Sequence, residues 1–149
     1  MRTSFTKEDF EGKLNTFWDY CFNSQCPMHD DCIHYVTGMF LDDGHNRGCA
    51  IFPSACHDGK CKYFRQARKI KMAWGFKKLF YDVKQRDASI IRVHLKCYLG
   101  SHSKYYRYAN GIYKLTPEQQ ERILNIFKRY GYTQGLEFDH YEDTPDLGI

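Results

Sequence analysis

Apolar side chains recur every three or four residues in several stretches of the chain, which is the spacing of an amphipathic helix. This spacing predicts about four helices, near residues 7–20, 74–82, 88–99 and 117–130. In the first of them, Phe10, Leu14 and either Phe17 or Trp18 would face the core. The last has a clear start, because Thr116 is followed by a proline at the first helical position and by Gln119, which completes a capping box.

Other stretches predict strands. Tyr105–Leu115 contains Asn110-Gly111, a pair that tolerates the positive φ angles of a type I′ turn, so two short strands are expected to form a hairpin. Residues 49–53 and 69–73 are further strand candidates. The pattern therefore predicts an α+β fold with a small antiparallel sheet, and a winged-helix-like arrangement of hairpin and helices is the alternative.

The length of 149 residues, with 42% hydrophobic side chains, suits a single domain spanning residues 1–149. No run of eighteen apolar residues is present, and the N-terminal residues lack the apolar region of a secretory signal. These features predict a cytoplasmic protein that does not enter a membrane. Its seven cysteines are then expected to be reduced, and clustered thiols in that setting are typical of metal ligands.

Three cysteines lie close together, at positions 21, 26 and 32. Thiolates are the soft ligands that Zn²⁺ and iron–sulfur clusters prefer, and short loops bring several of them together at low entropic cost. The predicted ligand set is Cys21, Cys26, Cys32 and Cys61, with Cys56, His57, His29 and His34 competing for the fourth place. Zinc is expected first and an iron–sulfur cluster second. The alternative is that these cysteines are small buried apolar residues.

Four thiolates would fill every position of a tetrahedral ion, so the predicted site is a structural staple without an open position for substrate. The chain shows no glycine-rich phosphate loop, paired-carboxylate motif or recognisable triad, and no catalytic residue is predicted. His94 and Cys97 lie three residues apart on one predicted helix, but no third group is evident to orient them. A cysteine-dependent enzyme or redox sensor, acting through Cys49, Cys56 or Cys97, is the least favoured hypothesis.

Charge is divided unevenly along the chain. The net charge is +4, yet residues 60–107 contain fourteen Lys and Arg against two Asp and Glu. Aromatic residues alternate with these cations, a combination that predicts a nucleic-acid surface with phosphates at the cations and bases on the rings. The residues predicted to bind nucleic acid are Lys62, Arg65, Arg68, Lys69, Lys71, Lys77 and Lys78. A solvated basic face over buried aromatic residues is the alternative.

The chain also carries an ordered set of motifs: Cys21-Phe-Asn-Ser-Gln-Cys26-Pro with Cys32 downstream, Cys61-Lys-Tyr-Phe, Ala73-Trp-Gly-Phe, Leu115-Thr-Pro-Glu-Gln-Gln and Ile126-Phe-Lys-Arg-Tyr-Gly131-Tyr. In this order it resembles an uncharacterised family of small proteins from gut Bacteroidales with a Cys-x4-Cys-Pro-x4-Cys motif. The resemblance implies that Cys21, Cys26, Cys32 and Cys61 are the matching cysteines. It implies no activity and no catalytic residue.

The leading hypothesis is a metal-stabilised nucleic-acid-binding or regulatory module, with DNA or RNA as the partner. The alternative is a protein-interaction domain, such as one encoded by a mobile element, whose acidic ends and basic centre meet oppositely charged partners. The oligomeric state does not follow from the sequence.

Overall fold

The computed structural model describes residues 3–148 and divides into two compact units. Unit 1 comprises residues 3–69 and 145–148, and unit 2 comprises residues 70–144. The described residues form five α-helices and three two-stranded sheets, so the predicted α+β class is confirmed. That residues 1–149 form a single domain stays a prediction.

Unit 1 is built from short elements around helix α1. Its strands are β1 (Asp19–Cys21), β2 (Cys49–Ile51), β3 (Cys56–His57) and β4 (Lys60–Cys61), its α-helix is α1 (Ile33–Met39), and its 3₁₀ helices are Lys7–Asp9, His29–Asp31 and Pro53–Ala55. β1 and β2 are parallel, and β1 packs against α1. β3 and β4 are antiparallel and are joined by Asp58 and Gly59, which both have positive φ angles as a tight two-residue turn requires. The strand predicted at residues 49–53 is confirmed as β2.

The helix predicted at residues 7–20 is wrong. Only one 3₁₀ turn, Lys7–Asp9, forms there, because Gly12 has a left-handed φ of +69° and the Asn15 side chain accepts a hydrogen bond from the Phe17 backbone N–H (2.9 Å). Phe17 points outward and is 81% exposed, so its predicted place in the core is wrong. Trp18 is the buried residue, and its indole N–H donates to the Thr37 hydroxyl (2.9 Å).

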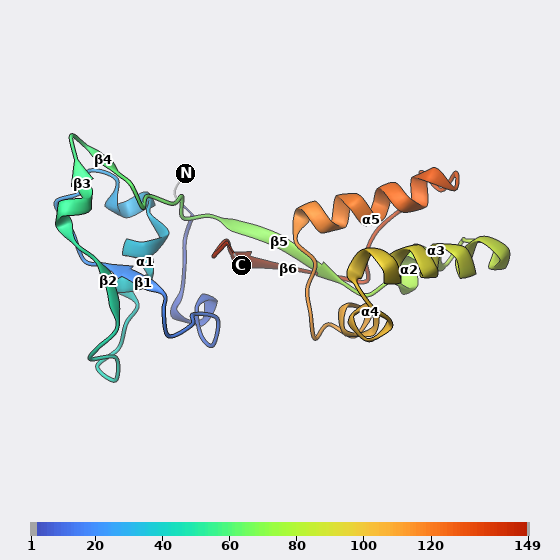
Figure 1. The fold of residues 1–149 in the computed structure, drawn as a ribbon, viewed down its shortest axis with the longest axis horizontal. Coiled ribbons are helices and arrows are strands. Elements are labelled where there is room, and N and C mark those ends of the chain that lie inside the picture. The colour runs from blue at the N-terminus through green and yellow to red at the C-terminus, as the bar shows by residue number, and fades with distance from the viewer. Residues whose placement is uncertain (1–2, 149) are drawn as a thin grey trace. The chain divides into compact units, whose positions relative to one another are not determined.

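Unit 2 is mainly helical (Figure 1). It contains α2 (Lys77–Phe80), α3 (Gln85–Leu99), α4 (His102–Ala109) and α5 (Pro117–Arg129), together with the paired strands β5 (Lys69–Trp74) and β6 (His140–Pro145), whose outermost residues are counted in unit 1. Helix α3 packs against both α4 and α5. The predicted helices at 88–99 and 117–130 are confirmed, and the helix predicted at 74–82 is shortened to α2.

The hairpin predicted at residues 105–115 is wrong. Residues 102–109 form α4, whose Ser101 N-cap accepts a hydrogen bond from the Lys104 N–H (3.1 Å) and whose Tyr105 is buried in the core of unit 2. Asn110 has a φ of −96°, so the Asn-Gly pair ends a helix and does not form a type I′ turn. The winged-helix alternative depended on this hairpin and loses its support. None of the helices in residues 3–148 combines the length and apolar character that a membrane span needs.

Candidate metal centre and charged surfaces

The elements of unit 1 bring five cysteine thiols together. Cys21 ends β1, Cys26 and Cys32 lie on either side of the 3₁₀ helix His29–Asp31, and Cys56 and Cys61 face each other as partners in the β3–β4 ladder. The Cys21 thiol interacts electrostatically with those of Cys26, Cys32 and Cys61. All four predicted ligands therefore lie close enough together for their charges to interact.

The fifth thiol is that of Cys56, one of the competing candidates. It forms a hydrogen bond with the Cys26 thiol and interacts electrostatically with the thiols of Cys61 and Cys21. Cys49 and Cys97 are exposed and show none of these interactions within the described chain. The structure thus separates five clustered cysteines from two others.

Backbone N–H groups point at two of the clustered sulfur atoms. The Tyr63 N–H donates to Cys61 Sγ (3.4 Å), and the Asn23 N–H donates to the Cys21 sulfur, in each case from two residues after the cysteine. Such N–H donors stabilise a thiolate and fix its direction, as the groups around metal-bound thiolates do. Burial nevertheless raises the pKa of Cys21, and burial followed by the hydrogen bond with Cys26 raises the pKa of Cys56. A bound cation would reverse this balance by stabilising the charged form.

The donor set fits zinc or an iron–sulfur cluster in its chemistry, since it consists of soft sulfur ligands. In residues 3–148, however, no group of three or more His, Cys, Asp or Glu side chains is placed to hold a metal ion. The four-thiolate site therefore stays a prediction.

Two of the competing histidines have other partners. His29 Nδ1 lies 2.6 Å from the Cys26 carbonyl oxygen and its Nε2 lies 3.1 Å from Asp30. His34 Nδ1 lies 2.6 Å from the Asp19 carbonyl oxygen, and its ring stacks on Trp18. Both ring nitrogens of His29 are thus engaged, which disfavours His29 as a ligand. The contacts of His34 do not decide against it, because a metal-bound histidine commonly donates its other ring N–H to a carbonyl oxygen.

The predicted basic stretch is divided between the two units, and four of its seven residues pair with carboxylates distant in sequence. Arg68 Nη2 lies 2.8 Å from Asp146, which Arg65 also approaches at 3.6 Å. Lys69 pairs with Asp9 (3.1 Å), and Lys78 pairs with Glu137 (3.6 Å). The other three predicted residues, Lys62, Lys71 and Lys77, are exposed and take part in no ion pair among the described residues. Their role in binding nucleic acid stays a prediction.

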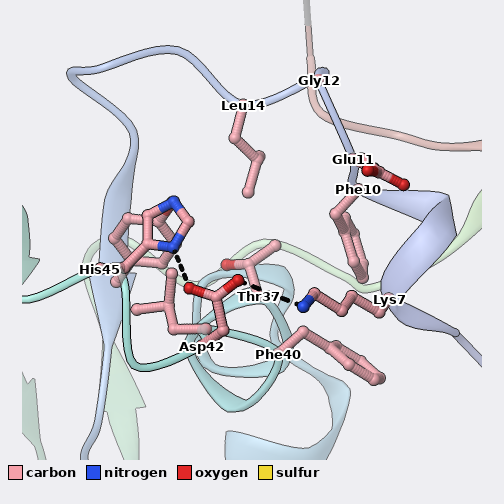
Figure 2. A pocket seen from close by; sticks show the side chains of 11 residues that line it. Lys7, Phe10, Glu11, Gly12, Leu14, Thr37, Phe40, Asp42 and His45 are labelled. Atoms are coloured by element: carbon pink, nitrogen blue, oxygen red, sulfur yellow. Dashed lines mark hydrogen bonds and ion pairs between the residues drawn. The ribbon is translucent and has the colours of Figure 1, made fainter.

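A pocket of about 280 Å³ in unit 1 was not foreseen from the sequence (Figure 2). Its apolar wall includes Phe10 and Phe40, and at its polar side Asp42 accepts hydrogen bonds from His45 Nδ1 (2.8 Å) and Lys7 Nζ (3.2 Å). The His45 contact, then those of Lys7 and the Gly44 N–H, lower the pKa of Asp42 to about 2. The sequence signal was the Asp-Asp-Gly-His run, which is typical of an Asx turn. These contacts tie the connection after α1 to the N-terminal segment.

Comparison with curated proteins and with solved structures gave no match. Over residues 2–147 the chain matches the family model described as a family of unknown function, DUF6078. Because the match covers nearly the whole chain, the protein belongs to the DUF6078 family.

Proposed function

We propose that the protein is a metal-stapled module that binds nucleic acid, with zinc held by Cys21, Cys26, Cys32 and Cys61. The observation that carries the proposal is the gathering of these four thiols, with two backbone N–H donors directed at sulfur, within one small unit. An iron–sulfur cluster is the second candidate for the same ligands.

The small core of unit 1 supports a structural role for the metal. Its buried cluster consists of Phe10, Trp18, Ile33, Ala67 and Leu147, whereas the cluster of unit 2 contains twelve buried residues. A unit of some seventy residues with so little buried apolar surface needs another source of stability, and metal binding commonly supplies it in small domains. A structural metal would join β1, the segment before α1, and the β3–β4 hairpin.

Elemental analysis and an absorption spectrum of freshly purified protein test the metal. A colourless sample with about one zinc per chain, the stoichiometry of a closed four-thiolate site, supports the proposal. A brown sample that contains iron indicates an iron–sulfur cluster bound by the same cysteines. A folded protein without any metal would overturn the site.

The nucleic-acid part of the proposal is supported by unit 2, which carries thirteen Lys and Arg against eight Asp and Glu. Fluorescence anisotropy with labelled DNA and RNA at two salt concentrations tests it. If the protein contacts phosphates, its affinity should fall steeply as the salt concentration rises. Absence of binding at low salt would contradict the proposed nucleic-acid binding. Pull-down from a nuclease-treated lysate identifies the alternative, since partners that persist after nuclease treatment indicate a protein-interaction domain.

We infer in addition that the protein works in the cytoplasm, where thiols stay reduced. We also infer that the family belongs to gut Bacteroidales and shares the Cys-x4-Cys-Pro-x4-Cys motif. An alignment of its members tests both, and members that lack Cys26 or Cys61 but keep the other thiols would contradict the shared ligand set.

A further inference from the structure

An aromatic groove of about 420 Å³ lies on unit 2 between α2, α3 and α4. Phe76 and Tyr105 are buried at its base, with ring centroids 5.1 Å apart. Tyr81, 86% exposed, and Tyr106, 45% exposed, present their rings to solvent beside it. Lys77, Arg92 and the amide of Asn110 line it as well, and within the described chain no acidic residue does.

Arg92 is held at this groove by aromatic side chains. Its guanidinium carbon lies 4.6 Å from the centroid of the Phe80 ring, and its charge interacts favourably with the Tyr105 hydroxyl. These contacts fix the direction of the side chain but leave its charge in place. Arg92 is therefore a positioned cation that forms no ion pair with any carboxylate the structure describes.

Lys96 stands one turn further along α3 and repeats this arrangement. Its Nζ lies 5.5 Å from the ring centroid of Tyr105 and 5.7 Å from that of Tyr106. No ion pair joins Arg92 or Lys96 to a carboxylate of residues 3–148. This separates both residues from Arg65, Arg68, Lys69 and Lys78, whose charges are offset by nearby acids.

We propose that the aromatic groove binds single-stranded nucleic acid, with bases stacked on Tyr81 and Tyr106 and phosphates at Arg92 and Lys96. Cations whose charge is not neutralised attract phosphates, and exposed rings beside them offer faces to unpaired bases. A duplex hides its base faces in its own stack and cannot use those rings. The inference rests on the proposed nucleic-acid function and names the site and the form of the strand.

The test measures anisotropy of labelled oligo-dT, oligo-U and a DNA duplex, each of about 12 nucleotides or base pairs, a length within the range that single-strand-binding folds cover. The groove variants are Tyr81→Ala and Arg92→Gln. Their matched controls are Phe17→Ala, which removes an exposed aromatic ring of unit 1, and Arg129→Gln, which removes an exposed charge of α5. Circular dichroism and thermal melting verify that each variant is folded; Tyr81 is so exposed that its removal is expected to leave folding intact.

We expect each groove variant to bind single strands about tenfold more weakly, as loss of one stacked base or one phosphate contact implies, and each control to stay within about twofold of the native protein. A preference for oligo-U or for oligo-dT supports the proposal and identifies the strand. Equal affinity of groove variants and controls, or a preference for duplex, would show that the groove is not the single-strand site. Neither result would contradict nucleic-acid binding by the protein as a whole. No binding of any probe by the native chain at low salt overturns both proposals.

Discussion

The two units differ in how their side chains are buried. Unit 2 places twelve residues in one apolar cluster, including Phe127, Ile91 and Leu115, none of which is exposed, and has one cysteine. Unit 1 buries five residues in its cluster and holds six of the seven cysteines. One chain thus combines a unit with an ordinary hydrophobic core and a unit whose apolar core is small and whose thiols are gathered. We therefore expect metal removal to destabilise unit 1 and to leave unit 2 unaffected.

The largest expected effect comes from Cys26→Ser, because Cys26 is buried among the clustered thiols and serine is a poor zinc ligand. We expect loss of bound zinc and a fall in the unfolding free energy of unit 1 of about 4 kcal/mol or more. Zinc content and chemical denaturation measure the two effects. Cys97→Ser, at an exposed cysteine of unit 2, is the control and should change neither; equal effects of both variants would remove the distinction between the units.

Phe127→Ala tests the apolar core of unit 2. Phe127 is fully buried and its ring contacts that of Phe80 edge-on, with centroids 5.1 Å apart. Its truncation should lower the stability of unit 2 by about 3–5 kcal/mol. Zinc content should stay that of the native protein, which elemental analysis of the same sample checks. Loss of zinc in this variant would contradict a metal site that depends on unit 1 alone.

Gly38→Ala tests the contact between α1 and β1 in unit 1. Gly38 lies on α1 where the helix meets β1, and a Cβ there would stand 2.7 Å from the Cys21 carbonyl oxygen. That backbone oxygen cannot yield without moving β1, so we expect a destabilisation of about 1–3 kcal/mol, together with weaker zinc retention during chelator competition. Gly48→Ala is the control, since a Cβ at Gly48 has nothing within 4 Å. Identical behaviour of the two variants would argue against a tight α1–β1 contact.

Asp42 gives the smallest expected effect, and it concerns pH. Its pKa is lowered from 3.8 to about 2, first by the hydrogen bond from His45 and then by Lys7. Because the folded form holds the charged carboxylate more firmly, this contribution to stability is complete above about pH 4 and is lost as pH falls through about 2. Asp42→Asn should reduce the acid dependence of unit 1 stability, followed by Trp18 fluorescence, whereas Asp43→Asn at the exposed neighbouring residue should not. Matching acid-unfolding curves would show that the carboxylate has no such role.

The sequence predicted those parts of the fold that depend on contacts between residues close together in the chain. The start of α5 was readable because Thr116 and Gln119 cap each other through backbone hydrogen bonds of 3.3 and 3.0 Å. The Asn110-Gly111 pair misled the prediction because it can end a helix as well as turn a hairpin, and the burial of Tyr105 in the core of unit 2 decides between the two. In the first segment the apolar spacing was helical, but Gly12 adopts a left-handed conformation that the pattern does not reveal.

The candidate sites, like the fold, could be predicted only where their causes lie between residues close together in the sequence. Short loops made Cys21, Cys26 and Cys32 recognisable as a group, whereas the contacts of Cys56 depend on its pairing with Cys61 across β3–β4. The basic stretch looked unneutralised because its acidic partners, such as Asp146 for Arg68, lie far away in sequence. The groove cations Arg92 and Lys96 were hidden for the opposite reason: their partners are aromatic rings brought together by tertiary packing.

We propose that a metal held by thiolates stabilises unit 1, whereas unit 2 relies on its apolar core. Hydrogen exchange of the intact protein, measured residue by residue before and after zinc removal by a chelator, tests it most directly. We predict that amides of α1, β1 and the β3–β4 hairpin lose protection after zinc removal, that amides of α3 and α5 keep theirs, and that added zinc restores the first set. Unchanged protection throughout unit 1 in the metal-free protein would contradict the claim.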